Sequence, residues 1–483
     1  MKSWSFYNRS FYSEGIGYFL YNALTGKLLQ LDEQHYRQTE VIRAGEETVG
    51  NGNAEFMVAL ELCGFMTDKE DERRMLMLNR LRRDQQSADS SILMLSICPT
   101  LECNFRCAYC FEPRKSDKTV MSRETIGKLL DFIKKHKEYR KLSVSWYGGE
   151  PTMAFDVVEM LTEQFLELYP DYDHATLITN AYLLDREKAE KLNRLKITNV
   201  QVTLDGTASL HDCRRPLKSG APTYNTIINN LDMLMNSSFN GSCSVRMNLD
   251  RGNLAEFSDL RSELLERYKN KPLTIYPARI STKHWAANER FEDIGGHEWA
   301  DFIVRGYCEH GILPETGIYP YSNVLKTCMA GIDHGYVVAP GGELYKCWED
   351  IGKENMIAGS LYSNKFDDFN SIALRYRMEG DPFLDAGCME CQVFPICDGG
   401  CIKKRLAGRH HPQSGIDFCS PYKEGLEMYL AAYVETYHKL EICNIILGNA
   451  VTASMKKGYR LVDPNSSVHE GEQCLDSAEA HAG

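Results

Sequence analysis

The chain has 483 residues, 43% hydrophobic and 25% charged, which is ordinary for a folded protein of about two to four domains. Its formal net charge of −12 argues against nucleic acid as a partner, because binding phosphates requires a clustered positive surface. The sequence shows no apolar run of roughly 18 residues that would predict a membrane span, and its first residues, MKSWSF, lack the layout of a secretory signal. We therefore expect a cytoplasmic protein with no membrane partner.

Residues 1–90 predict a small N-terminal domain of mixed α and β structure. Strands at 17–22 and 26–31 flank a turn and predict a hairpin. Helices are expected near 33–44 and 53–62, and Gly64 is a plausible C-cap of the second helix. The charged segment 67–90 predicts a surface helix or connector.

From residue 91 to about 310 the pattern alternates between strand and helix. Strands are expected at 91–98, 142–146, 175–179, 200–204, 243–247 and 273–276, and helices near 122–136, 154–168, 184–193, 223–236 and 254–268. Repeated β–α steps favour a parallel sheet, open or barrel-like, and we expect a partial (β/α)6 TIM-like barrel. In such folds the chemistry lies at the C-terminal ends of the strands.

Residues 320–425 are rich in cysteine and glycine and predict few long helices. A domain of this kind lacks the apolar volume for a good core, so it needs metal or disulfide crosslinks. Seventeen cysteines are unusual in a reducing compartment and favour metal ligation or redox catalysis. Residues 426–483 complete a helix expected at about 421–443 and then form a tail, which from Pro464 has the composition of a disordered segment.

The first cysteine cluster directly follows the first strand of the barrel. It reads Cys103-Asn104-Phe105-Arg106-Cys107-Ala108-Tyr109-Cys110, which has the form C-x3-C-x2-C. Three thiolates on one loop can occupy three irons of a [4Fe–4S] cluster and leave the fourth iron open for reaction. The alternative is a zinc knuckle with a histidine as fourth ligand, and no histidine lies within about 20 residues of the motif.

A second motif, Trp146-Tyr147-Gly148-Gly149-Glu150-Pro151, follows the second strand. The two glycines allow backbone carbonyls to approach a ligand closely, and the Glu150 carboxylate or a nearby carbonyl can accept hydrogen bonds from an ammonium group. The two motifs, with strand and helix in this order, resemble those of radical S-adenosylmethionine (SAM) enzymes. The resemblance implies that the open iron chelates SAM and that SAM cleavage gives a 5′-deoxyadenosyl radical.

This resemblance also implies roles for individual residues. Cys103, Cys107 and Cys110 would hold the catalytic cluster, and Tyr109 would pack against the adenine of SAM. The other implied SAM contacts are Gly148, Gly149, Glu150, Thr179, Asn180, Thr203, Asp205 and Arg215. The alternative for each strand-end residue singly is that it satisfies backbone groups.

The C-terminal cysteines resemble those of the SPASM domain, which carries two auxiliary [4Fe–4S] clusters in a subset of radical SAM enzymes. By that family's pattern the distal cluster is held by Cys388, Cys391, Cys397 and Cys419, and the nearer one by Cys328, Cys347 and Cys401. Ser322 stands where fully ligated relatives have a further cysteine, so the nearer cluster has an open iron or takes Cys308 as its fourth ligand. The alternative, a pair of zinc sites, favours paired C-x2-C units, and only one such unit occurs here.

Enzymes of this kind mostly modify peptides or proteins. The N-terminal segment resembles leader-peptide-recognition domains, in which a peptide adds to a sheet edge, although it can also be a mere capping domain. We therefore expect a maturase that installs a thioether or carbon–carbon crosslink in a ribosomally made precursor peptide, supplied with electrons by a flavodoxin- or ferredoxin-like donor. One alternative is an anaerobic sulfatase-maturing enzyme, which forms formylglycine. Those enzymes have an Asp directly after the cysteine equivalent to Cys347, where this chain has Trp348, then Glu349 and Asp350. The other alternative is a non-catalytic iron–sulfur electron carrier.

Overall fold

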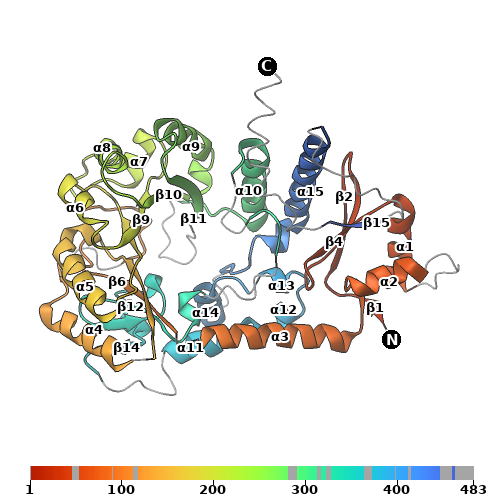
Figure 1. Ribbon diagram of the computed structural model, residues 1–483, viewed down its shortest axis with the longest axis horizontal. Coiled ribbons are helices and arrows are strands. Elements are labelled where there is room, and N and C mark those ends of the chain that lie inside the picture. Colours follow the sequence, from red (N-terminus) through yellow and green to blue (C-terminus); the bar gives the residue numbers. More distant parts are fainter. Residues whose placement is uncertain are drawn as a thin grey trace.

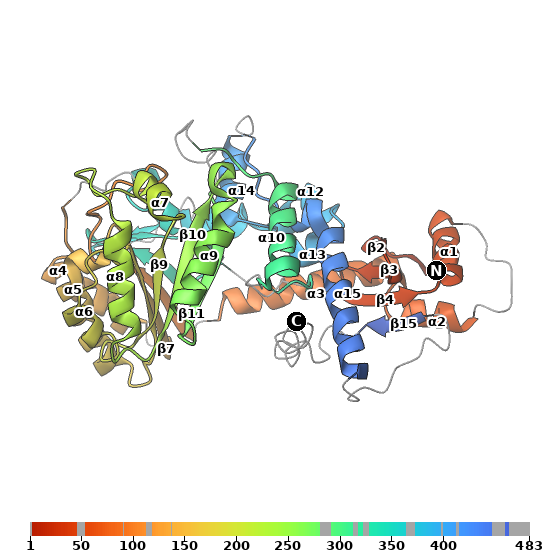
Figure 2. The same ribbon diagram turned by 90° about the horizontal axis from the view of Figure 1, so that it is seen from above.

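The computed structural model describes residues 2–45, 54–89, 91–112, 118–136, 138–280, 291–312, 317–321, 328–363, 372–397, 399–411, 415–446 and 459–462. Figures 1 and 2 show a barrel-like body at one end, a small sheet with helices at the other, and long and short helices between them. None of the helices within the described ranges is long and apolar enough to cross a membrane.

The barrel-like body is built on six parallel strands that lie side by side in chain order. They are β6 (Ile92–Ile97), β7 (Lys141–Trp146), β8 (Ala175–Thr179), β9 (Ile197–Thr203), β10 (Ser242–Leu249) and β11 (Leu273–Arg279). Helices α4 (Arg123–Lys135), α5 (Phe155–Leu168), α6 (Arg186–Lys191), α8 (Tyr224–Met235) and α9 (Glu256–Arg267) cover their outer face (Figure 1). β11 does not pair with β6 in the described sheet, so the predicted partial barrel is confirmed.

The helices of the barrel follow from their local sequence. In α4 the Ser122 side chain caps the N-terminus by accepting a hydrogen bond from the Thr125 amide (3.0 Å). Its buried residues Ile126, Leu129, Leu130 and Ile133 recur at helical spacing and face the sheet. Trp146, at the end of β7, stacks against Phe165 of α5 inside the same core.

The N-terminal part contains the predicted hairpin and a strand from the far end of the chain. β3 (Gly17–Asn22) and β4 (Lys27–Leu31) pair antiparallel, with β2 (Asn8–Ser13) on the outer side of β3. On the outer side of β4 lies β15 (Tyr459–Val462), which the sequence did not lead us to expect. Helices α1 (Glu33–Ala44) and α2 (Ala54–Leu62) match the predicted ranges, and the tail from Pro464 lies outside the described residues.

The surface helix α3 (Lys69–Ser87) runs from the N-terminal sheet along the cysteine-rich region (Figures 1 and 2). Two ion pairs hold it there: Arg80 contacts Asp381 at 3.0 Å, and Arg377 contacts Asp84 at 3.3 Å. The segment predicted as a surface helix or connector is therefore a helix that packs against the cysteine-rich region.

The cysteine-rich region continues the barrel sheet. β12 (Gly335–Val338) pairs in parallel with β6, and β13 (Glu343–Tyr345) and β14 (Gly359–Ser360) extend the sheet antiparallel. The rest is short helices, as expected: α11 (Ile372–Met378), α12 (Ala386–Met389), α13 (Phe394–Cys397) and α14 (Ile402–His410).

Two long helices stand between the barrel and the N-terminal sheet (Figure 2). α15 (Tyr422–Ile446) was predicted, whereas α10 (Gly296–His310) was not. The Glu424 carboxylate of α15 accepts a hydrogen bond from the His297 amide (2.7 Å) in the first turn of α10. Gly425 and Ala300 let the two helices approach closely, since a Cβ on Gly425 would lie 2.3 Å from the Cβ of Ala300.

Candidate active site

A cavity of about 220 Å³ contains the predicted cluster loop and nearly all of the predicted SAM contacts. It is lined by Cys103, Phe105, Cys107, Tyr109, Cys110, Phe111, Glu112, Tyr147, Gly148, Gly149, Glu150, Ile178, Thr179, Asn180, Gln201, Thr203, Arg215, Arg246, Asn248, Arg279, Ile280, Trp348 and Glu349. The fold therefore brings together residues that are far apart in the sequence, and the one predicted SAM contact missing from this lining is Asp205.

The cluster loop is held at its first cysteine. The Sγ of Cys103 accepts hydrogen bonds from the Phe105 amide (3.4 Å) and from the Asn180 side-chain amide (3.9 Å). Asn180 also donates to Asn104 Oδ1 (2.8 Å), so the end of β8 fixes the start of the loop. Burial, together with the nearby Glu150 charge, raises the pKa of Cys103. Three cysteines lining such a cavity fit an iron–sulfur cluster, because thiolates there need the compensating charge of metal ions.

The Gly148–Gly149 loop packs directly on the backbone that leads into Cys103. A Cβ on Gly149 would lie 2.2 Å from the carbonyl oxygen of Glu102, and Gly148, at φ 121°, would meet the Thr100 carbonyl oxygen at 2.7 Å. The Gly149 amide donates to that Thr100 oxygen (3.1 Å). Glycine is thus required here because one backbone segment lies against another. The sequence had led us to expect a different reason, the close approach of a ligand.

Glu150 ties the ends of β7 and β8 together. Its Oε1 accepts hydrogen bonds from the Thr152 amide (3.0 Å) and from the hydroxyls of Thr152 and Thr179 (both 2.6 Å), while Oε2 accepts one from the Asn180 amide (2.7 Å). Burial raises the pKa of Glu150, and these hydrogen bonds oppose the rise. The carboxylate is therefore engaged by four donors of the protein itself.

Tyr109 and Arg215 meet at the cavity wall. The Tyr109 hydroxyl accepts hydrogen bonds from Arg215 Nη1 (2.5 Å) and from the side-chain amide of Asn248 (3.0 Å). The Arg215 guanidinium also lies over the Phe105 ring, 5.7 Å from its centroid. The predicted aromatic residue is thus held in place by a buried cation.

Asp205 lies behind the cavity wall, which differs from the position expected of a SAM contact. The residue is fully buried, and its Oδ1 accepts a hydrogen bond from the Asn248 amide (3.1 Å). Its Oδ2 lies 3.6 Å from the Arg214 guanidinium. The carboxylate therefore supports Asn248 and, together with Asp250 at 3.1 Å, balances the charge of Arg214 behind the cavity.

Several cavity residues were missed from the sequence. These are Gln201 of β9, two positions before the predicted Thr203, and Arg246 and Asn248 of β10, which are also two positions apart, so each pair points to the same face of the sheet. Polar residues at this period near strand C-termini are a signal that could have identified them. Trp348 and Glu349 also line the cavity, and the Trp348 and Tyr147 rings lie 5.2 Å apart.

The adjacent residue, Asp350, points elsewhere. It is fully buried, and its carboxylate pairs with Lys403 and accepts a hydrogen bond from the Tyr376 hydroxyl (2.5 Å). Of the two acids noted after Cys347, Glu349 is therefore the one that reaches the cavity.

Some of the C-terminal cysteines lie close enough to influence one another's pKa. The pKa of Cys397 is raised by burial and by the nearby Cys419 and Cys388, and that of Cys401 by burial, with a contribution from Cys328. Cys388 and Cys419 each accept a hydrogen bond from a cation, Arg405 (3.0 Å) and Lys423 (3.6 Å). Within the described ranges no three His, Cys, Asp or Glu side chains form a group that could hold a single metal ion. Cys308 is exposed on α10, and Ser322 lies outside the described residues.

Comparison with known proteins identifies the family. Residues 97–264, which carry the cluster loop and the Gly-Gly-Glu motif, match the model of the radical SAM superfamily. The chain is a radical SAM enzyme. Membership of this family implies SAM and a [4Fe–4S] cluster as cofactors. It also argues against the alternative of a non-catalytic electron carrier.

The radical SAM enzyme is similar to an anaerobic sulfatase-maturating enzyme in sequence, and to anSMEcpe and SuiB in fold. It is 23% identical over 386 residues to a serine-type anaerobic sulfatase-maturating enzyme of Klebsiella aerogenes, covering 71% of this chain and 90% of the relative. Its fold matches the structure of anSMEcpe with bound AdoMet and Kp18Cys peptide (TM-score 0.57, 18% identity, 72% of this chain and 99% of the other). It also matches Streptococcus suis SuiB bound to precursor peptide SuiA (TM-score 0.50, 16% identity, 84% of this chain and 96% of the other).

Proposed function

We propose that the enzyme is a radical SAM/SPASM maturase that installs a thioether or carbon–carbon crosslink in a ribosomally made peptide. The observation that carries this proposal is the N-terminal sheet, in which β2 is an edge strand within the described structure. An edge offers unpaired backbone groups to which an extended peptide can add as a further strand. The fold of SuiB, described as bound to its precursor peptide, covers 84% of this chain, against 72% for anSMEcpe.

In this proposal the cavity holds SAM and its cluster. Cys103, Cys107 and Cys110 would be the cluster ligands. The four donors on the Glu150 carboxylate favour a backbone carbonyl of the Gly148–Gly149 loop as acceptor for the SAM ammonium. When bound, cluster and SAM supply a radical that abstracts a hydrogen atom from the substrate.

The auxiliary region would contribute two further [4Fe–4S] clusters and one wall of the reaction site. Cys328, Cys347 and Cys401 would hold the nearer cluster, and Cys388, Cys391, Cys397 and Cys419 the distal one. Arg405 and Lys423 would offset the charge of the thiolates in the distal set. Glu349, which lines the cavity, would be the acid that accepts a substrate proton, because Asp350 is engaged by Lys403 and Tyr376. The external electron donor would be a flavodoxin- or ferredoxin-like protein.

Formylglycine formation is the second candidate, favoured by the similarity to the Klebsiella sulfatase-maturating enzyme. Trp348 stands where that activity would place an aspartate directly after Cys347, which argues against it.

The test is anaerobic reconstitution followed by incubation with SAM, a reductant and candidate precursor peptides taken from any short reading frames beside the gene. We expect iron and sulfide for three clusters, SAM cleavage, and a peptide that has lost two hydrogen atoms per crosslink. Replacing Cys103, Cys107 and Cys110 with Ala should abolish cleavage while the auxiliary iron remains. Modification of a sulfatase peptide alone would select the second candidate.

A further inference from the structure

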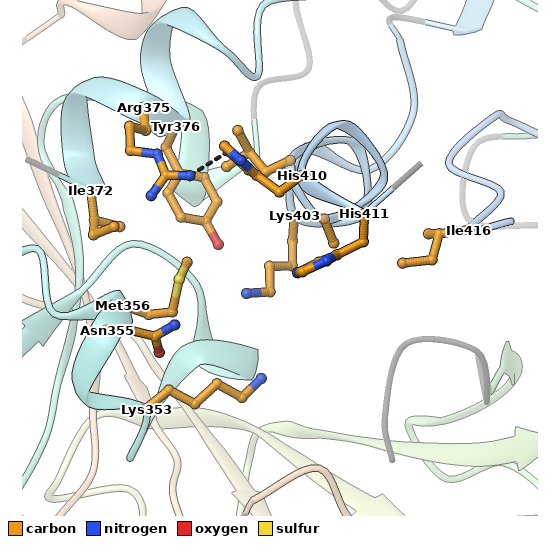
Figure 3. Close-up of a pocket in the computed structure, with 12 residues that line it drawn as sticks. Lys353, Asn355, Met356, Ile372, Arg375, Tyr376, Lys403, His410, His411 and Ile416 are labelled. Atoms are coloured by element: carbon orange, nitrogen blue, oxygen red, sulfur yellow. Dashed lines mark hydrogen bonds between the residues drawn. The ribbon is translucent and has the colours of Figure 1, made fainter. Parts of the chain in front are cut away.

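A second cavity, of about 420 Å³, lies in the cysteine-rich region between α11, α14 and the turn η6 (Glu354–Met356) (Figure 3). Its lining residues are Lys353, Asn355, Met356, Ile372, Arg375, Tyr376, Lys403, Leu406, Ala407, His410, His411 and Ile416. None of them lines the cavity of the cluster loop. The two cavities are therefore separate sites.

Basic side chains dominate the second cavity, and among its lining residues none is acidic. Lys403 is neutralised by Asp350. Glu379, outside the lining, pairs with His410 (2.8 Å) and lies 3.5 Å from Arg375.

Lys353 is the lysine of this cavity that forms no ion pair among the described residues. Its side chain is half-buried. Burial and the nearby positive charge of Lys403 lower the pKa of Lys353, and the carboxylates of Asp350 and Glu349 oppose this shift. A cation in this setting stabilises an anion strongly, because the surrounding low dielectric weakens screening.

Much of the remaining lining is apolar. Met356, Ile372, Leu406 and Ile416 lie around the same cavity as the cations. A small hydrated ion would leave this surface unused, whereas a carboxylate carried by an apolar body would contact both parts. The lining is thus complementary to a carboxylate next to an aliphatic or aromatic group.

One short turn contributes to both cavities. Glu349 lines the cluster cavity, and the adjacent Asp350 holds Lys403 and Tyr376 of the second cavity. The turn η5 (Trp348–Asp350) thus connects the lining of the two cavities. A chain that reacts on one side of this turn can be held by a neighbouring segment on the other.

We propose that the second cavity binds an acidic, partly apolar segment of the peptide substrate, with Lys353 contacting its carboxylate. This inference rests on the proposed function, since it takes the substrate to be a peptide. It adds a binding site for substrate outside both the cluster cavity and the N-terminal sheet.

The test is calorimetric binding to the reconstituted holoenzyme of the probe acetyl-Asp-Leu-Asp-Phe-amide and of its Asn-Leu-Asn-Phe counterpart. We expect the acidic probe to bind at least about tenfold more tightly, and Lys353→Gln to weaken its binding by about tenfold, as for the loss of a charge-assisted contact. The matched control is Lys128→Gln, the same change at an exposed position of α4, which should bind as the wild type does. Iron content and thermal unfolding establish that each variant is folded.

Three outcomes would overturn the proposal: no binding of the acidic probe, equal binding by Lys353→Gln and wild type, or equal binding of the Asn probe. Inorganic phosphate or succinate that binds as tightly as the probe, with the same sensitivity to Lys353→Gln, would show a small-anion site and refute the peptide assignment. Probe binding needs no turnover. If the probe binds but the enzyme modifies no peptide, only the proposed function is contradicted. If the enzyme modifies peptide but Lys353→Gln binds the probe as the wild type does, only this binding site is contradicted.

Discussion

Replacing Gly149 with Ala should damage the cluster loop. The added Cβ would lie 2.2 Å from the carbonyl oxygen of Glu102 and 2.4 Å from that of Leu101, well inside the roughly 3.5–4.0 Å at which non-bonded carbon atoms attract. Both contacts are with backbone, which cannot rotate away, so we expect the upper part of the overpacking range, about 2–3 kcal/mol. Because Glu102 immediately precedes Cys103, the displacement should reach the first proposed cluster ligand. Thermal unfolding and iron per chain after anaerobic reconstitution measure the two effects.

Gly127→Ala is the matched control for this experiment. Gly127 lies inside α4, and a Cβ there would meet nothing within 4 Å. An Ala in a helix interior gains up to about 1 kcal/mol over Gly, so this variant should be slightly more stable and keep all of its iron. The reasoning fails if Gly149→Ala matches the wild type in stability and iron content, or if the two variants behave alike.

The remaining predictions concern the acids after Cys347 and the C-terminal strand. Asp350→Asn should cost about 3–5 kcal/mol in urea unfolding, because it leaves the buried Lys403 charge without its partner. Glu349→Gln should instead keep SAM cleavage and lose peptide modification, and equal loss of both would refute its role as proton acceptor. Val462→Asp should destabilise the protein by about 2 kcal/mol or more, because Val462 is 2% exposed, whereas Leu461→Asp, at a residue 48% exposed, should change stability by less than about 0.5 kcal/mol. Similar melting curves for these last two variants would argue against β15 as part of the N-terminal sheet.

The barrel was predictable from sequence because its signals are local. Each strand is a short apolar run, and each helix shows apolar residues at helical spacing, as α4 does. Strand β15 gave no such signal. It has four residues, and its pairing of Val462 with Leu28 joins opposite ends of the chain. Only the folded structure shows that contact, since nothing in the local pattern names the partner of a strand.

The candidate site was predictable where a motif carries the chemistry. The cysteines and the Gly-Gly-Glu sequence are recognisable by their residue types and spacing. The role of Glu150 was harder to predict, since a carboxylate after two glycines looks the same whether it meets a ligand or, as here, Thr152, Thr179 and Asn180. Asp205 was likewise a polar residue at a strand end, and its burial beneath Asn248 depends on packing that the sequence does not reveal.

The cysteine-rich region and the barrel act on one cavity because they share one sheet. β12 pairs in parallel with β6, so Val338 lies beside Ile97, shortly before the cluster loop begins. β13 then returns antiparallel and leads through Cys347 into Trp348 and Glu349, which line the cavity. The change in composition near residue 320 therefore marks a change in chemistry within a continuous sheet. Any displacement of the Cys347 turn must move the cavity wall, which couples the proposed auxiliary cluster mechanically to the place where a substrate would react.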